Sequence, residues 1–462
     1  MTTRTRDALG ARDWGVLFVL CGAIFLEGID VAMLNVALPS IRADLGMSTG
    51  ELQWVMSAYV LGYGGFMLLG GRAADLFGRR RMFVGWLTVF LLFSGLGGFA
   101  TEGWMLITAR FVTGIAAAFM TPAGLSIITT GFEEGPRRDR ALLIYSGTGA
   151  AGFSIGLVIG GLLTSADWRW VFFAPVALSA LILLAALAFV PKSPRPDRTG
   201  ERLDLAGGIT VTGGIVLLVL GVERAAHAGP LRTLGTLAAG LVLLAVFALV
   251  ERRAAAPLVR LGILRSGPLL RANLAGLLFA AGFFGFQFVL VLYLRELRGW
   301  STLETSLAMT VIGIDAVLSP TLTPKLVARF GNARTIFGGL LLAALAYALF
   351  LRVGADWTYL AMLPGLIVLG LAFALAYGPL TIVATEGVEE AEQGLAGGLL
   401  YTSFQFGAAL GLSAVTAVGT AATASETAAD RLAGYHAALA VPLAAALLAA
   451  VISAFGLRSR AR

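Results

Sequence analysis

The sequence predicts an all-α polytopic membrane protein, and three observations support this prediction. Hydrophobic residues make up 58% of the 462-residue chain and charged residues only 13%, about half of the ~25% typical of soluble proteins. The apolar residues form continuous runs that are long enough to cross the ~30 Å hydrocarbon core as helices, without the alternation typical of a transmembrane β-barrel. Glycine is abundant, with 59 residues, and small residues allow transmembrane helices to pack closely.

Charged residues divide the chain into fourteen apolar segments. The predicted spans are 14–38, 51–71, 82–100, 104–130, 141–164, 168–190, 205–222, 233–250, 272–294, 304–324, 335–351, 357–384, 393–418 and 432–457. Segments 205–222 and 233–250 are just long enough, and if both lay at the membrane surface the chain would have twelve spans. The first apolar run shows no small-residue cleavage site, so we interpret it as a retained span rather than a signal peptide.

Lysine and arginine are distributed unevenly between the two sides of the predicted membrane. If the N-terminus lies inside, the inner segments hold 25 of these residues and the outer segments hold 8. Because cytoplasmic loops carry an excess of Lys and Arg, we expect a multi-pass protein of a bacterial cytoplasmic (inner) membrane with both termini cytoplasmic. This asymmetry also explains the net charge of +7 without nucleic acid as a partner.

Two segments of the chain resemble each other. Residues 71–81 follow the second span, and residues 324–334 follow the tenth. The matches, 253 positions apart, are Phe77 with Phe330, Gly78 with Gly331, and Arg81 with Arg334. We therefore expect a six-helix half over 14–190 and another over 269–457, separated by a linker, 191–268, that contains two extra spans.

Several segments resemble motifs of a known transporter family. The run from Gly71 to Arg81 is similar to the loop signature G-x-L-x-D-x-x-G-R-R/K of the major facilitator superfamily, with Ala73 at the leucine position. The motifs that resemble those of its fourteen-span drug:H+ antiporter branch are Asp30–Pro39, Arg110–Gly114, Gly149–Gly161, Asp167–Trp170 and Glu251–Pro257. Leu157 stands where the fifth-helix motif usually has proline, which predicts a less kinked helix. The resemblance covers nearly the whole chain and implies two six-helix halves with two extra central helices.

Four ionisable residues lie well inside the predicted spans: Glu27, Asp30, Arg110 and Asp315. Charge in the bilayer core is costly, so such residues usually face a cavity or a partner. At about 1.5 Å per residue, Glu27, Asp30 and Arg110 lie at a similar depth in the outer half of the membrane. Glu27 and Asp30 are three positions apart and share one helix face. Two carboxylates in a desolvated site favour retention of a proton.

We therefore predict that Asp30 is the leading proton-coupling carboxylate and that Glu27 is its partner or a substrate acid. The alternative is a static ion pair with Arg110 that only locks helix packing. Asp315 lies near the midplane and is either a substrate-specific acid or a group satisfied by nearby Ser or Thr. Asn35, within the first-helix motif, is assigned to the same cavity by the resemblance.

The loop after the second span carries a candidate conformational latch. A carboxylate at a helix–loop junction accepts hydrogen bonds from N–H groups or arginine side chains. The family resemblance implies that Gly71, Asp75, Gly78 and Arg79 help to hold the two halves in one state. The alternative is a basic membrane anchor with a turn glycine.

The fifth predicted span carries a row of glycines. The residues that match the antiporter motif are Gly149, Gly152, Gly156, Gly160 and Gly161. Spaced glycines also simply pack helices, so both interpretations remain open. Tyr63, among other aromatic and amide residues, is a further candidate for an apolar cavity wall.

The sequence favours a transporter over an enzyme. It has no G-x-x-x-x-G-K-[ST] motif, its two histidines lack metal-ligand spacing, and its single cysteine, Cys21, excludes a disulfide framework. We expect no cofactor and no metal. The resemblance implies a proton-coupled antiporter, expected to be monomeric, that exports small hydrophobic or cationic drugs or antibiotics by alternating access. Export of a lipid or a self-made metabolite is the alternative, and a membrane-embedded transferase is the least favoured.

Overall fold

The computed structural model is built from helices over the part of the chain that it describes. It describes residues 10–47, 49–191, 204–223, 229–254, 257, 259, 261–423, 425 and 427–458. All regular elements within these ranges are helical, which confirms the predicted fold class. Residues 192–203 and 224–228 of the predicted linker lie outside the described ranges.

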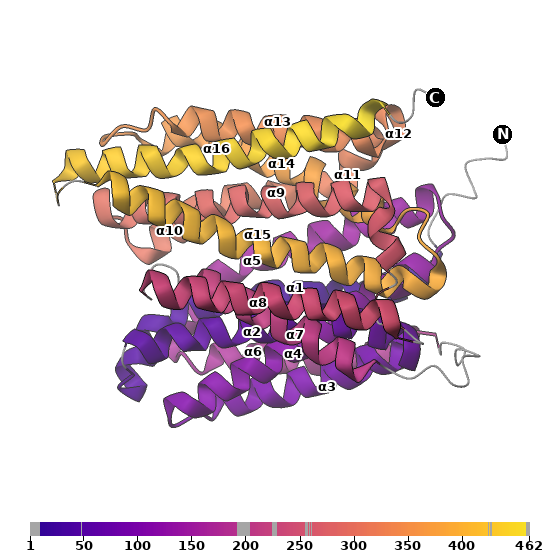
Figure 1. Cartoon of the computed structure of the whole chain (residues 1–462). Coiled ribbons are helices and arrows are strands. Elements are labelled where there is room, and N and C mark those ends of the chain that lie inside the picture. Colours follow the sequence, from indigo (N-terminus) through magenta and orange to yellow (C-terminus); the bar gives the residue numbers. More distant parts are fainter. Residues whose placement is uncertain are drawn as a thin grey trace. The chain divides into compact units, whose positions relative to one another are not determined.

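The chain divides into two compact units. Unit 1 contains residues 1–220, 236–265 and 385–402, and unit 2 contains residues 221–235, 266–384 and 403–462. In each unit the long helices lie lengthwise beside one another (Figure 1). The segment 385–402 belongs to unit 1, although the chain on either side of it belongs to unit 2.

The first eight helices lie entirely or largely in unit 1. They are α1 (Ala11–Leu45), α2 (Thr49–Phe77), α3 (Arg79–Gly98), α4 (Gly103–Gly131), α5 (Pro136–Ala166), α6 (Trp170–Phe189), α7 (Leu205–Glu223) and α8 (Pro230–Arg253). A short 3₁₀ turn, η1 (Leu261–Arg265), ends this part of the chain. Gly65 of α2 lies against Val216 of α7, so the first of the two extra helices packs within unit 1.

The remaining helices form unit 2, apart from the segment 385–402. They are α9 (Gly267–Leu292), the π-helical η2 (Tyr293–Leu297), α10 (Thr302–Met309), η3 (Thr310–Ile314), α11 (Asp315–Thr321), α12 (Thr323–Phe330), α13 (Asn332–Phe350), α14 (Tyr359–Thr385), η4 (Glu390–Glu392), α15 (Gln393–Ala422) and α16 (Ala428–Arg458). Helix η4 and the first turns of α15 belong to unit 1.

Thirteen helices of the described chain are long and apolar enough to cross a membrane. The predicted span 205–222 corresponds to α7, whose apolar part, Ala206–Gly221, is shorter than the others. The predicted span 304–324 is not one continuous α-helix, because a 3₁₀ turn, η3, separates α10 from α11. A second interruption separates α11 from α12, where Pro320 lies inside α11 and Pro324 in the first turn of α12; proline cannot donate the backbone hydrogen bond that continues a helix.

Close helix packing in unit 1 depends on glycines. A Cβ at Gly62 of α2 would lie 2.5 Å from the carbonyl oxygen of Phe111 on α4. A Cβ at Gly28 of α1 would lie 2.7 Å from the backbone nitrogen of Phe153 on α5. Because backbone atoms cannot move aside as a flexible side chain can, these pairs, α2 with α4 and α1 with α5, hold fixed positions for the polar residues that they carry.

The internal repeat has a conformational counterpart. Gly78 precedes α3 with φ 96°, and its repeat partner Gly331 precedes α13 with φ 80°. Both values lie in the region that residues with a Cβ rarely adopt. The same turn therefore follows the second helix of each predicted half.

Large apolar side chains remain exposed over the helices. Leu184 of α6 is 68% exposed, Leu241 of α8 is 60% exposed and Leu360 of α14 is 75% exposed. Soluble monomers rarely expose extensive apolar patches, whereas lipid tails solvate such side chains. The protein is accordingly a multi-pass membrane protein.

Candidate functional site

A buried ion pair joins α1 to α4 within unit 1. Asp30 Oδ2 accepts a hydrogen bond from Arg110 Nη1 at 2.5 Å, and both side chains are 2% exposed. The guanidinium carbon lies 4.4 Å from the ring centre of Tyr59 on α2, a distance at which the ring face attracts the cation. Arg110 Nε and Nη2 have no hydrogen-bond partner among the described residues, so within the described part of the chain Arg110 forms its ion pair with Asp30 through Nη1 alone.

Glu27 has a different set of partners. Tyr63 on α2 donates its hydroxyl to Glu27 Oε2 at 3.1 Å, and Thr121 on α4 donates its hydroxyl to Glu27 Oε1. The Glu27 residue is 7% exposed. Its two oxygens therefore contact neutral hydroxyl donors.

The two acids of α1 thus share a helix face but not a partner. Arg110 pairs with Asp30, whereas Glu27 bonds to hydroxyls from both α2 and α4. The rings of Tyr59 and Tyr63 stack with centres 5.7 Å apart and connect the two groups. Unit 1 therefore contains one continuous buried polar cluster that we call the α1 acid cluster, formed by Glu27, Asp30, Tyr59, Tyr63, Arg110 and Thr121.

The other two predicted cavity residues lie elsewhere. Asn35 is exposed, and its amide donates to the carbonyl of Val31 in its own helix at 3.1 Å. Asp315 belongs to unit 2, begins α11 directly after η3, and is 2% exposed. Its Oδ2 atom has no hydrogen-bond partner within the described part of the chain, so a buried carboxylate oxygen remains available there.

The glycine row of α5 faces α1. Cβ atoms at Gly152, Gly156 and Gly160 would lie 2.5 Å from Phe25 O, 2.7 Å from Ile29 Cα and 2.6 Å from Met33 Cα. A Cβ at Gly149 would contact the Ile24 side chain at 2.9 Å. Gly161 is on the same helix. The row brings α5 against the segment of α1 that carries Glu27 and Asp30.

The predicted latch residues contact the segment 385–402. Asp75 Oδ1 lies 3.7 Å from Arg79 Nε and accepts a hydrogen bond from the backbone N–H of Gly394 at 3.4 Å. A Cβ at Gly71 would lie 2.9 Å from the carbonyl carbon of Gly394, so only a glycine at position 71 allows this approach. Gly78 forms the turn that separates Asp75 on α2 from Arg79 on α3.

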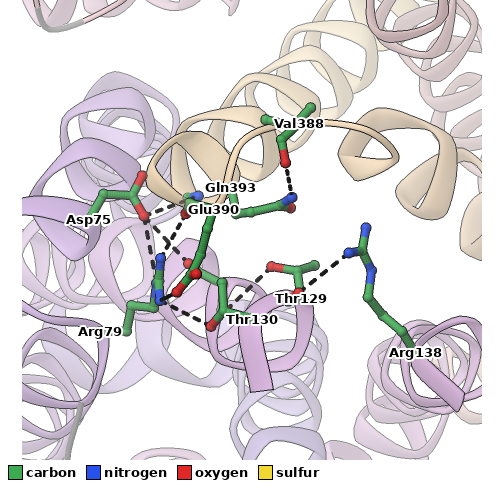
Figure 2. A network of polar contacts seen from close by, with 10 residues as sticks. Asp75, Arg79, Thr129, Thr130, Arg138, Val388, Glu390 and Gln393 are labelled. Carbon is green, nitrogen blue, oxygen red and sulfur yellow. Dashed lines mark hydrogen bonds and ion pairs between the residues drawn. The ribbon is translucent and has the colours of Figure 1, made fainter. Parts of the chain in front are cut away.

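Arg79 is the centre of this network (Figure 2). Its Nη2 atom donates to the backbone carbonyl of Glu390 at 2.7 Å, and its Nη1 atom lies 3.3 Å from the Glu390 carboxylate. Nη1 also donates to Thr130 Oγ1 at 3.1 Å. One guanidinium therefore joins α2, the end of α4 and η4.

A second arginine, Arg138 on α5, binds the same segment. It donates from Nη1 to the Thr129 carbonyl at 3.4 Å and from Nη2 to the Thr385 carbonyl at 3.1 Å. Figure 2 shows it on the far side of Thr129 from Arg79. Glu134 lies 3.7 Å from Arg138 and accepts the N–H of Gly387 at 3.2 Å. Arg138 and Glu134 thus contact the same segment as the predicted latch residues, and the sequence did not single them out.

A third network surrounds Asp44, beyond the membrane-spanning part of α1. Asp44 Oδ2 accepts hydrogen bonds from Arg169 Nη1 at 2.7 Å and from Trp168 Nε1 at 3.0 Å. The hydrogen bond from Arg169, followed by that from Trp168, lowers the pKa of the Asp44 carboxyl. Arg169 Nη2 also donates to the Ala100 carbonyl at 3.2 Å, so Asp167–Trp170 acts here as a connection between loops.

Comparison with known proteins gives one consistent result. The family model of the major facilitator superfamily matches residues 20–412. The puromycin resistance protein of Streptomyces alboniger is 37% identical over 90% of this chain and 83% of its own length. The cephamycin export protein of Amycolatopsis lactamdurans is 36% identical over 90% of this chain and 86% of its own length.

A solved structure has a similar fold. The human organic anion transporter MFSD10 matches with a TM-score of 0.70, over 96% of this chain and 100% of the human chain. Its sequence identity to this chain is 16%, so the likeness concerns the arrangement of helices alone.

Proposed function

Because the chain belongs to the major facilitator superfamily of membrane transporters, we propose that it exports small hydrophobic or cationic drugs or antibiotics by proton-coupled antiport. The relatives named for puromycin resistance and cephamycin export support this substrate class. The protein is a transporter and not an enzyme. Its proposed location is a bacterial inner membrane with both termini in the cytoplasm, as the asymmetry of Lys and Arg indicates.

The observation that carries the proposal is the buried pair of Asp30 and Arg110. A carboxylate 2% exposed inside a membrane helix is stable as an ion only while its cation is beside it. A proton on Asp30 removes that charge and releases Arg110, which then needs another partner. Proton binding therefore changes the interactions between α1 and α4, as coupling requires.

Glu27 supplies a second proton site in the same cluster. It contacts two hydroxyl groups, and a buried carboxylate without a cation favours its neutral, protonated form. A cationic substrate that approached Glu27 would favour proton release. Competition between substrate and proton for one carboxylate would link export of the first to import of the second.

The latch would control the alternation between two states. The segment 385–402 leads into α14 at one end and into the rest of α15 at the other. Arg79 and Arg138 bind its backbone carbonyls, and Asp75 accepts from its backbone N–H. In this proposal, these bonds form in one transport state and break in the other.

Asp315 and Asn35 would contribute to substrate selection. Asp315 is a buried acid with an unpartnered oxygen in the described structure, which suits attraction of a cationic group. Asn35 would add a polar amide on α1. Export of a self-made metabolite is a second candidate, which the cephamycin export relative favours.

Expression in an efflux-deficient bacterial host tests the proposal. Puromycin and a panel of lipophilic cations are the probes, and the readouts are growth inhibition and uptake into everted vesicles. We expect raised resistance and vesicle uptake that a protonophore abolishes. Resistance and uptake equal to those of the empty host over the whole panel would refute drug export, and uptake indifferent to the protonophore would refute proton coupling.

A further inference from the structure

The hydroxyl of Thr121 lies between two acceptors. One is Glu27 Oε1 on α1, and the other is the carbonyl of Ala117 in its own helix at 2.9 Å. A threonine hydroxyl has one proton to donate, so it bonds to one of the two acceptors at a time. Thr121 is 2% exposed, and water therefore does not replace the acceptor that it leaves.

The charge on Glu27 decides which acceptor is used. An ionised carboxylate only accepts hydrogen bonds, whereas a protonated carboxyl also donates one. With Glu27 ionised, the Thr121 proton points to Glu27 Oε1. With Glu27 protonated, the carboxyl donates to Thr121 Oγ1, and the hydroxyl proton of Thr121 turns to the Ala117 carbonyl.

This exchange takes place at a weak point of α4. The next residue, Pro122, lies inside the helix and has no N–H for the carbonyl of Ala118. A Thr side chain that bonds to the carbonyl four residues earlier bends a helix. The bond from Thr121 to Ala117 thus forms or breaks in the same turn of α4 in which the Ala118 carbonyl receives no backbone hydrogen bond from residue 122.

The groups that face Glu27 come from three helices. They are Asp30 on α1, Tyr59 and Tyr63 on α2, and Thr121 with Arg110 on α4. Helix α5 also packs against α1 near Gly28, but its residues 146–166 contain no titratable side chain. Tyr63 is a second donor to Glu27, and it has no proline beside it.

We propose that Thr121 is a positioning residue that transmits the protonation state of Glu27 to the bend of α4 at Pro122. This inference rests on the proposed proton-coupled function and adds a route by which one proton changes the shape of a helix. Because α4 also carries Arg110, the bend reaches the partner of Asp30. Thr121 would therefore link the two acids of α1.

Substitutions at Thr121 separate this role from simple packing. Thr121→Val keeps the branched shape and removes the hydroxyl, and Thr121→Ser keeps the hydroxyl. Thr113→Val is the matched control, because Thr113 is buried in α4 and its hydroxyl donates to the carbonyl of Arg110 in its own helix. All variants are purified, reconstituted in liposomes and assayed with ethidium over a series of internal pH values.

We expect Thr121→Val to raise the pH of half-maximal transport by about one unit. The ionised form of Glu27 loses a donor, and one hydrogen bond to a charged group corresponds to about one unit of proton affinity. Thr121→Ser and Thr113→Val should keep the wild-type midpoint. Tyr63→Phe should also raise the pH midpoint, because Tyr63 is the other donor to Glu27. In the Glu27→Gln background, which lacks the titrating group, adding Thr121→Val should not change the pH dependence of transport further.

Hydrogen exchange of peptides covering residues 116–126 reports on the bend. Because amide exchange itself depends on pH, the readout is the protection factor, which is the observed rate relative to the intrinsic rate at each pH. We expect protection factors that change with pH in the wild type and in Thr121→Ser, and protection factors that do not change with pH in Thr121→Val and Glu27→Gln. An unchanged pH midpoint and unchanged exchange in Thr121→Val, with wild-type transport intact, would overturn the role of Thr121 alone. Absence of pH-driven transport in the wild type would instead overturn the proposed function. If Thr121→Val is not recovered folded, a wild-type midpoint in Tyr63→Phe together with a pH-independent protection factor in the wild type would overturn the inference.

Discussion

Removal of one charge from the Asp30–Arg110 pair should strongly destabilise the protein. In Asp30→Asn, the amide keeps the shape of the side chain but leaves the Arg110 charge unpaired at a site where both side chains are 2% exposed. Loss of one partner of a buried ion pair costs about 3–5 kcal/mol. The contact of Arg110 with the Tyr59 ring is present in both proteins and does not reduce this difference.

A double-mutant cycle measures the pair directly. Asp30→Asn and Arg110→Gln are made singly and together, and the free energy of unfolding is measured in detergent by denaturant titration. The double variant has no unpaired charge, so it should regain at least about 2 kcal/mol relative to the sum of the single losses. The control is Asp13→Asn, because the ion pair of Asp13 with Arg137 is partly exposed, at 27% and 40%, and should contribute less than about 1 kcal/mol. Additive losses in the cycle would refute the pairing.

Three further predictions concern the other networks. The Asp75→Asn variant should insert into the membrane normally but transport about tenfold more slowly, as expected for the loss of one charged interaction of about 1.4 kcal/mol. Wild-type turnover of this variant in vesicles would contradict the latch and favour the alternative, a basic membrane anchor. Gly152→Ala should lower the free energy of unfolding of the detergent-purified protein by about 1–3 kcal/mol, because the added methyl group overpacks against α1. The control Gly85→Ala has open space around it and should keep the wild-type stability, and equal stabilities of the two variants would contradict a packing role for Gly152. Arg169 lowers the pKa of the Asp44 carboxyl, so the stabilisation from this contact is complete above the ordinary carboxyl pKa of about 3.9 and is lost as pH falls through the lowered value. Arg169→Gln should therefore raise the midpoint in an infrared titration of the Asp44 carboxyl, with Asp44→Asn as the blank. An unchanged midpoint would exclude Arg169 as the cause of the lowered pKa.

Most of the fold follows from the sequence because a helix that crosses lipid must satisfy its own backbone hydrogen bonds and expose apolar side chains. These demands produce long apolar runs bounded by charge, as in 168–190 and 357–384. The sequence does not reveal the 3₁₀ turn η3, because Asp315 is the one charged residue between Glu304 and Lys325 and the segment is apolar enough overall to suit lipid. Hydropathy reports whether a segment suits lipid and does not report a local change of helix type.

The candidate site was only partly predictable. Spacing along α1 places Glu27 and Asp30 on one face, but the rotation of α4 against α1 decides which acid meets Arg110. That rotation depends on tertiary packing, for example where Gly124 of α4 approaches the Leu20 side chain of α1. Thr121 gave no sequence signal, because buried Thr residues in helices commonly bond to their own backbone.

The partners of the predicted latch residues could not be identified from the sequence for a different reason. The Asp75 motif identifies one side of the contact, while Glu390 and Gly394 lie more than 300 positions later in the chain. Arg138 lies in a basic segment, residues 137–140, that the sequence predicts only to favour the cytoplasmic side. A basic residue beside the membrane serves as an anchor whether or not it also binds a helix end, so composition alone does not separate the two roles.

The measurement that tests the central claim most directly is proton release on substrate binding. Purified protein in weakly buffered detergent solution is mixed with puromycin or ethidium, and the change in pH is read with an indicator dye. The account predicts release of protons by the wild type, reduced release by Asp30→Asn and by Glu27→Gln, and none by the double variant. Substrate binding to the wild type without any proton release would contradict proton-coupled export through the acids of α1.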